Sequence, residues 1–138
     1  MTMKSGRFRF YNRLIAFTLI ASLSTASVSF TSGYTYLSKE ELKSQLGSPK
    51  LVVLDVRASL GWILSFSKIK GAMRENPGKV ESWLADYSKD KTIVLYCQSQ
   101  NTSSHVAQKL VSAGFQKVYV LKGGWNEWSK ANFPTEKK

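Results

Sequence analysis

Cys97 is the residue of this sequence best placed for nucleophilic chemistry. It directly follows the apolar run Thr92–Tyr96 and precedes a short polar segment, Gln98–Thr102, after which helical spacing begins near Ser103. A loop wrapped at a helix N-terminus directs several backbone N–H groups inward and forms a concave anion site. Such surroundings favour the thiolate over the thiol. The pattern predicts a sulfur that attacks an anionic sulfur donor, holds a persulfide or attacks phosphate.

The cysteine and histidine counts leave open whether Cys97 is reactive or inert, and they argue against a zinc site. Cys97 is the only cysteine, so it cannot form an internal disulfide. Because free cysteines are among the most often buried side chains, an inert core thiol is the alternative to a reactive one. The chain has a single histidine, His105, and no second cysteine, so a zinc site is not expected. We interpret His105 as a surface residue.

Apolar runs and helical spacing alternate along the chain. Ser38–Glu41 fits a capping box at the start of a helix that Gly47 ends, after the β-prone lead-in Tyr34–Tyr36. Continuous apolar runs predict strands that are buried on both faces, as in a parallel sheet. The predicted strands are residues 51–56, 69–73, 92–96 and 117–121, and the later helices are residues 78–87, 103–113 and 125–130. The alternation predicts an α/β fold, in which ligands bind at the carboxyl ends of the strands.

The N-terminal residues have the layout of a secretory signal peptide. The first 13 residues contain four basic and no acidic side chains, an apolar run follows at residues 14–21, and small residues follow at 24–29. The apolar run is shorter than the roughly 20 residues that a membrane span needs. We expect a signal peptide at residues 1–26, a linker at 27–35, a folded domain at 36–138 and a periplasmic or secreted location. The alternative is an uncleaved signal that anchors the chain in the membrane.

The charge balance favours anionic partners. Without residues 1–26 the chain keeps 16 basic and nine acidic residues, a net charge of +7. Such a surface attracts small anions, acidic lipids or nucleic acid, although a solvated lysine-rich surface is the simpler interpretation. Export argues against nucleic acid, and no basic run is interleaved with aromatic residues. We expect a monomer without a cofactor and without stable membrane insertion after signal cleavage.

Four segments resemble, in order and spacing, the motifs of rhodanese-like domains. They are Leu54–Arg57, Ile69–Ala72, the strand, loop and helix from Tyr96 to Phe115, and Val118–Trp125 with Trp128 and Pro134. The resemblance covers residues 35–137. It implies a three-layer α/β/α fold with a central, mainly parallel sheet flanked by helices. It also implies a sulfurtransferase whose loop has the length found in that family, whereas related phosphatases have a loop one residue longer.

The resemblance assigns roles to individual residues. Cys97 would take sulfane sulfur from thiosulfate or a persulfide and pass it to cyanide or a thiol. Asp55 and Arg57 would support the site, mainly through the fold. The backbone of the loop would bind substrate and stabilise developing negative charge, as an oxyanion hole does, at Gln98, Ser99, Gln100, Asn101, Thr102 and Ser103. From its position alone, Ser103 is predicted to be the N-cap of the following helix.

Several positions depart from the family pattern. Thr102 stands where the family often has an arginine, and Gln100 replaces a common glycine. Gly61 replaces a glutamate, and the pair Ser67-Lys68 replaces a glycine-histidine pair. The loop therefore lacks a cation that would face thiosulfate. Arg74 follows the glycine-alanine segment and could supply this charge from another strand end, or it could be a surface arginine.

Two classes of function remain from the sequence. The first is an exported sulfurtransferase or sulfane-sulfur carrier that forms a persulfide on Cys97. The second is a non-catalytic binding or sensing module, which Thr102 favours. Retention of the cysteine favours the first, because a scaffold would tolerate serine or aspartate there. A phosphatase is disfavoured by the loop length.

Overall fold

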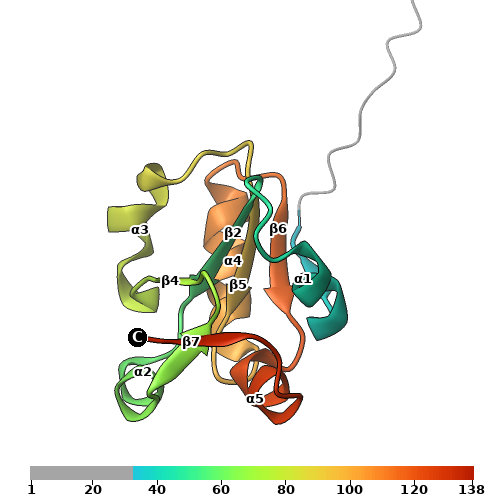
Figure 1. The fold of residues 1–138 in the computed structure, drawn as a ribbon. Helices are drawn as coiled ribbons and strands as arrows, with labels where there is room; N and C mark the ends of the chain where they lie inside the picture. Colours follow the sequence, from blue (N-terminus) through green and yellow to red (C-terminus); the bar gives the residue numbers. More distant parts are fainter. Residues whose placement is uncertain (1–32) are drawn as a thin grey trace, which may run out of the picture.

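A parallel sheet of five strands forms the centre of the fold (Figure 1). The computed structural model describes residues 33–138, so the predicted signal peptide lies outside the described residues. The strand order is β1-β6-β5-β2-β4, and every neighbouring pair is parallel. The strands are β1 Thr35–Leu37, β2 Leu51–Asp55, β4 Met73–Arg74, β5 Thr92–Tyr96 and β6 Val118–Leu121. Within residues 33–138, no helix has the length and apolar character needed to cross a membrane.

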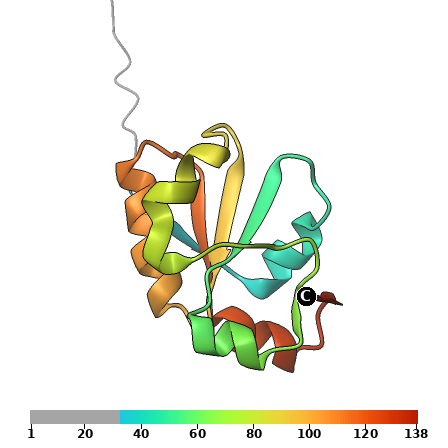
Figure 2. The same ribbon diagram turned by 90° about the vertical axis from the view of Figure 1, so that its left-hand side faces the viewer.

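Helices cover both faces of this sheet (Figure 2). Alternate residues of a strand point to opposite faces, so Val53 and Leu54 belong to different core clusters. The cluster of Leu54 includes residues of α3 and α4, and the cluster of Val53 includes residues of α1 and α5. The helices are α1 Lys39–Gln45, α2 Ser59–Leu64, α3 Val80–Trp83, α4 Asn101–Ser112 and α5 Gly124–Lys130. The predicted three-layer α/β/α fold is confirmed.

The prediction of one continuous helix at residues 78–87 is wrong. A single α-helical turn, α3, lies between two 3-10 turns, Pro77–Lys79 and Leu84–Asp86. Lys79 has φ −131° and ψ 38°, which is outside the helical region and interrupts the hydrogen-bond ladder. By contrast, the capping box of α1 is confirmed: Ser38 Oγ accepts from the Glu41 N–H at 3.2 Å, and the Ser38 N–H donates to Glu41 Oε2 at 2.8 Å.

The strand predicted for residues 69–73 is also wrong. The segment divides between β3 Ser67–Ile69, which pairs antiparallel with β7 Thr135–Lys137 in a separate two-stranded sheet, and β4 of the main sheet. Gly71 lies between them with φ +78°, a conformation that turns the chain and that side-chain-bearing residues rarely adopt. The two-stranded sheet brings the C-terminal residues against the segment that follows α2.

Candidate active site

Cys97 lies directly after β5, at the carboxyl edge of the sheet. Its side chain is 3% exposed and contributes to the core cluster that α4 covers. The sulfur contacts one residue of α4 twice: Cys97 Sγ lies 3.3 Å from Ser103 Oγ and accepts from the Ser103 N–H at 3.4 Å. The structure therefore brings together the predicted nucleophile and a predicted loop residue.

Ser103 does not cap the helix, contrary to the sequence prediction. Helix α4 begins at Asn101, so Ser103 lies in its first turn and Gln100 occupies the N-cap position without a side-chain cap bond. The Ser103 hydroxyl is free to turn toward the sulfur because the capping function is not required of it. Ser103 Oγ also lies 3.1 Å from the Gln100 carbonyl oxygen, which accepts its hydrogen bond when the sulfur does not.

The loop before α4 presents backbone donors without protein acceptors. In the part of the chain that the structure describes, no protein group accepts from the backbone N–H of five consecutive residues, Gln98, Ser99, Gln100, Asn101 and Thr102. The N–H groups of a first helical turn lack intrahelical partners, and together with the helix dipole they attract anions. The loop therefore has the donor set that a bound anion or a charged persulfide needs.

The N-terminus of α5 holds this loop from the other side. The Trp125 N–H donates to the Cys97 carbonyl oxygen at 2.9 Å, and the Asn126 N–H donates to the Gln98 carbonyl oxygen at 3.1 Å. In a planar trans peptide the C=O and the following N–H point in opposite directions. The N–H groups of Gln98 and Ser99 therefore point away from α5, which leaves them available to a ligand.

Gly124 allows α5 to approach the cysteine loop this closely. It has φ +55°, and a Cβ atom at this position would lie 2.1 Å from the Ser99 carbonyl oxygen and 2.5 Å from the Cys97 carbonyl oxygen. The sequence indicated only a turn at Gly123-Gly124. The structure shows in addition that the second glycine is a contact surface for the cysteine loop, a role that sequence reasoning missed.

Asp55 and Arg57 form a buried network next to β5. Both side chains are fully buried, and Arg57 Nη2 donates to Asp55 Oδ2 at 2.6 Å. Tyr96, the residue before Cys97, pairs in register with Asp55 and donates its hydroxyl proton to Asp55 Oδ2 at 2.6 Å. The same hydroxyl accepts from the Ile69 N–H at 3.1 Å. The network thus fixes the end of the strand that carries the cysteine.

Aromatic rings enclose the Arg57 guanidinium. Its central carbon lies 4.5 Å from the Trp125 ring centroid and 5.4 Å from the Trp62 ring centroid. Within residues 33–138, Arg57 Nη1 is the one buried side-chain nitrogen or oxygen without a hydrogen-bond partner. Stacking on aromatic faces compensates part of the cost of burying this cation. Trp125 therefore connects the buried ion pair to the loop that it anchors through its N–H.

Arg74 lies at the end of β4 and binds backbone oxygens of the neighbouring chain segment. Its Nη1 donates to the Asp55 carbonyl oxygen at 3.1 Å and to the Arg57 carbonyl oxygen at 2.5 Å. Burial lowers the pKa of the Arg74 guanidinium from its ordinary value, and the negative charge of Asp55 opposes this effect. Both contacts hold the chain where it leaves β2. That Arg74 supplies charge to the cysteine loop stays a prediction.

The Tyr96 phenol is held in its neutral form. Burial raises its pKa, and the charge of Asp55 together with the hydrogen bond to that carboxylate raises it further. A raised folded pKa gives a stabilisation that is fully present below the ordinary tyrosine pKa of about 10 and is lost as pH rises toward the folded value.

We expect Tyr96→Phe to leave the native absorbance titration at alkaline pH unchanged, because Tyr96 does not ionise there. In denaturant the same substitution removes one of six phenols from the curve. A native curve that also loses one phenol would contradict the assignment.

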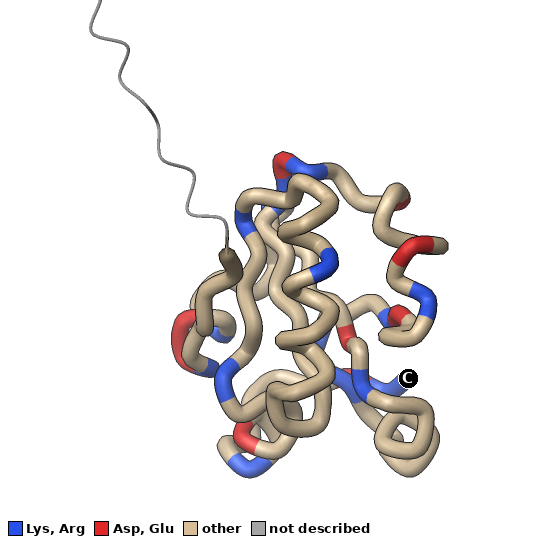
Figure 3. The backbone as a smooth tube through the Cα atoms, turned by 180° about the vertical axis from the view of Figure 1, so that it is seen from behind, with Lys and Arg blue, Asp and Glu red and all other residues tan. Residues whose placement is uncertain are grey.

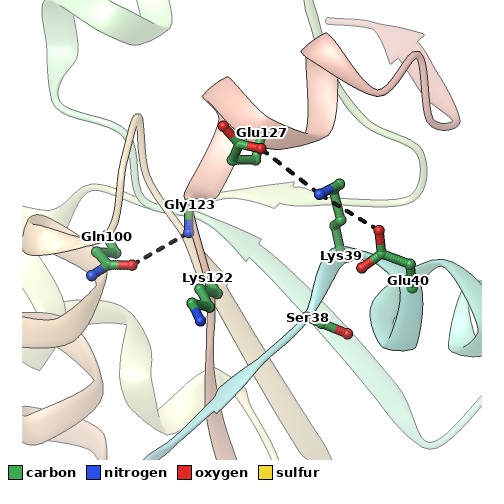
Figure 4. Close-up of a pocket in the computed structure, with 7 residues that line it drawn as sticks. All are labelled: Ser38, Lys39, Glu40, Gln100, Lys122, Gly123 and Glu127. Atoms are coloured by element: carbon green, nitrogen blue, oxygen red, sulfur yellow. Dashed lines mark hydrogen bonds and ion pairs between the residues drawn. The ribbon is translucent and has the colours of Figure 1, made fainter.

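A separate hollow of about 460 Å³ lies beside Gln100 (Figure 4). Gln100 Oε1 accepts from the Gly123 N–H at 3.3 Å, which gives the loop a third anchor, this one through a side chain. Lys39 in this hollow is paired with Glu40 at 3.5 Å and Glu127 at 3.7 Å, so much of its charge is neutralised. Cys97 does not line the hollow.

His105 is exposed, and within residues 33–138 no three His, Cys, Asp or Glu side chains are grouped to hold a metal ion.

These features define a cysteine-loop site at the carboxyl edge of a parallel α/β sheet. The model of the rhodanese-like domain family matches residues 38–131. The chain belongs to the rhodanese-like domain family. A thiosulfate sulfurtransferase, GlpE, of Coxiella burnetii is 31% identical over 102 residues, which are 74% of this chain and 92% of that protein.

Solved structures with similar folds agree with the family. The rhodanese-like domain of the Alr3790 protein from Anabaena is 31% identical and superposes with a TM-score of 0.65, over 75% of this chain and 79% of that one. A Rhodopseudomonas palustris protein described as a possible tyrosine phosphatase is 25% identical, with a TM-score of 0.66, over 75% of this chain and 85% of that one. At the level of the family, the chain is related to sulfurtransferases.

Proposed function

We propose that this protein is an exported sulfurtransferase or sulfane-sulfur carrier that works through a persulfide on Cys97. The Cys97 thiolate attacks the outer sulfur of thiosulfate, the sulfur–sulfur bond of the donor breaks, and sulfite leaves with the electron pair. Cyanide or a thiolate then attacks the terminal sulfur of the persulfide. Thiocyanate or an acceptor persulfide is released, and the Cys97 thiolate is restored.

One observation carries this proposal: the sulfur accepts one backbone N–H, and the loop between Cys97 and Ser103 contains further backbone donors without protein acceptors. The Ser103 N–H points to Cys97 Sγ at 3.4 Å, and five preceding N–H groups have no protein acceptor within residues 33–138. Donors held in place stabilise negative charge as it develops, at no reorganisation cost during the reaction. The exposed residues Gln98 and Ser99 leave the edge of the loop open to solvent.

Thiosulfate turnover with cyanide as the acceptor tests the activity. We expect wild-type protein to form thiocyanate and Cys97→Ser to form none, since serine cannot hold a sulfane sulfur. Ser103→Ala is expected to retain activity at a reduced rate, because its backbone N–H still reaches the sulfur. Equal rates for wild type and Cys97→Ser would refute the proposal and favour the non-catalytic binding module.

Because the loop lacks a cation, we expect that introducing one at Thr102 raises the activity toward thiosulfate. Thr102 lies in the first turn of α4, half-buried and next to Ser103. A hydrogen bond to a charged group contributes about 1.5–3 kcal/mol, so Thr102→Arg is expected to raise kcat/KM for thiosulfate roughly tenfold or more. Thr102→Gln, which adds length without charge, is the matched control. If Thr102→Gln gives the same increase, charge is not what the loop lacks.

Export is the part of the proposal that depends on the N-terminal sequence. The basic start, the short apolar run and the small residues near Ala26 support a signal peptide. After cleavage the chain would act in the periplasm or outside the cell, where few other free thiols persist. A lone cysteine in that compartment is consistent with a sulfur carrier, because it has no intramolecular partner with which to be oxidised to a disulfide.

A further inference from the structure

Helix α2 leaves its apolar side chains in solvent. Leu60, Ile63 and Leu64 are 69%, 68% and 69% exposed, and Phe66, just beyond the helix, is 90% exposed. None of the residues of α2 is buried. A surface helix of a globular domain ordinarily turns its apolar face to the core, and contiguous exposed apolar patches mark interaction sites. Within residues 33–138, no segment covers this surface.

The exposed side chains border a groove that reaches the cysteine loop. Leu60, Leu64, Phe66, Gln98 and Trp125 line this α2 groove, together with Gly61, Ser65 and Ser67, and its volume is about 530 Å³. Gln98 directly follows Cys97, and its side-chain oxygen lies 3.2 Å from the position of a Cβ at Gly61. Trp125 donates its N–H to the Cys97 carbonyl oxygen. A molecule in the groove therefore contacts Gln98 and Trp125, the residue after Cys97 and the residue that holds the Cys97 carbonyl.

The α2 groove is uncharged inside and basic at its rim. Residues 58–67 contain no charged side chain, in a chain that is 21% charged. Lys68 follows them but is paired with Glu136 at 3.1 Å, so the positive charge at the rim comes from Lys137, which pairs in register with Ser67, and from Lys138. The Lys138 N–H donates to the Phe66 carbonyl oxygen, and its Nζ lies 4.3 Å from the Trp62 ring centroid. Figure 3 shows α2 without charged residues and the blue C-terminal end of the chain beside it. The complement of this surface is an apolar segment flanked by carboxylates.

We propose that the α2 groove docks the protein that accepts sulfur from Cys97, a protein whose accessible cysteine lies beside an apolar segment flanked by acidic residues. The inference rests on the proposed persulfide chemistry. In the docked complex the acceptor thiolate attacks the terminal sulfur of the persulfide, and the bond between that sulfur and Cys97 Sγ breaks. The acceptor then carries the persulfide, and Cys97 leaves as the thiolate, so no oxidant or reductant is consumed.

Binding is tested without sulfur chemistry, so that it stands apart from the proposed function. The probe is a fluorescent amphipathic helical peptide with an apolar face, flanking glutamates and serine in place of its cysteine, titrated into the full chain with Cys97→Ser. We expect saturable binding that Leu64→Ser with Phe66→Ser weakens about tenfold, a typical effect of removing anchor residues. Tyr36→Ser, at another exposed aromatic residue, is the matched control and is expected to bind normally.

Three outcomes of the binding experiment overturn the proposal. The first is equal binding of a peptide with lysines in place of the glutamates, which removes the charge argument. The second is concentration-dependent dimerisation that Leu64→Ser with Phe66→Ser abolishes, which identifies a second copy as the occupant. The third is groove-dependent sedimentation with vesicles of phosphatidylcholine and phosphatidylglycerol in the absence of peptide binding, which identifies a membrane surface.

A sulfur-transfer experiment then distinguishes docking in the α2 groove from the chemistry at Cys97. Protein loaded with sulfur is mixed with the cysteine-containing form of the peptide or with glutathione, and persulfide on each acceptor is measured by mass. We expect Leu64→Ser with Phe66→Ser to slow transfer to the peptide about tenfold and to leave transfer to glutathione unchanged, since a small thiol needs no docking surface. Equal slowing of both acceptors would show that the substitutions act on the chemistry and would overturn the proposal. Failure of wild type to load sulfur, with peptide binding intact, would instead refute only the proposed activity.

Discussion

Gly124→Ala is expected to lower the free energy of unfolding by about 2–5 kcal/mol and to remove most sulfur loading. The added Cβ would lie 2.1 Å from the Ser99 carbonyl oxygen, which is backbone and cannot rotate away. The N-terminus of α5 must then move, and its N–H bonds to the carbonyl oxygens of Cys97 and Gln98 are lost. Denaturant unfolding and the mass shift after thiosulfate treatment measure the two effects.

Gly47→Ala is the matched control for Gly124→Ala. Gly47 also has positive φ, +87°, but a Cβ there would have no atom within 4 Å. Gly47→Ala is therefore expected to lower the free energy of unfolding only by the strain of a left-handed backbone, about 1–2 kcal/mol, and to retain sulfur loading. If the two substitutions are equally destabilising and both load sulfur, the contact between α5 and the cysteine loop does not organise the site.

Asp55→Ala is expected to be the other strongly destabilising change, at about 3–5 kcal/mol. It leaves Arg57 fully buried without its counter-charge and removes the acceptor of the Tyr96 hydroxyl. Replacement of a whole buried pair by apolar residues is far better tolerated than removal of one partner. The double variant Asp55→Leu with Arg57→Met should therefore unfold at higher denaturant than Asp55→Ala, which keeps the prediction testable if the single variant folds poorly.

The exposed pair of Lys109 and Glu81 is the control for this comparison. Lys109 Nζ and Glu81 Oε1 are 2.9 Å apart, but the two side chains are 50% and 71% exposed. Solvent screens such pairs, so Glu81→Ala should cost less than about 1 kcal/mol. A loss for Glu81→Ala comparable to that for Asp55→Ala would mean that burial does not set the strength of the Asp55 and Arg57 pair.

The elements that follow strong local rules could be predicted from sequence. The strands around Val53 and Val94 are continuous apolar runs, and the capping box at Ser38 is a short-range pattern that depends on four residues. The position of Cys97 after a buried strand follows from the same pattern. These features are encoded by neighbours in the chain, so tertiary context did not alter them.

The missed elements are those that depend on distant partners. Strand β7 forms because Thr135–Lys137 meets β3, some 70 residues earlier in the chain. Helix α2 was not predicted because none of its residues is buried, so it has no core-facing stripe to recognise. The role of Gly124 depends on a contact with Ser99 across the fold, although two adjacent glycines at a helix start were a usable signal. The start of α4 at Asn101 shows that serine spacing alone does not define an N-cap.

Intact mass of the purified protein, before and after incubation with thiosulfate and then with cyanide, shows whether Cys97 carries sulfane sulfur. We expect wild-type protein to gain the mass of one sulfur atom, Cys97→Ser to gain none, and cyanide to remove the added sulfur. A polysulfide donor serves as the second arm, because it offers sulfane sulfur without the sulfonate group of thiosulfate that a loop cation would face. No gain of sulfur from either donor would rule out persulfide formation on Cys97 and leave a rhodanese-like fold that works without sulfur transfer.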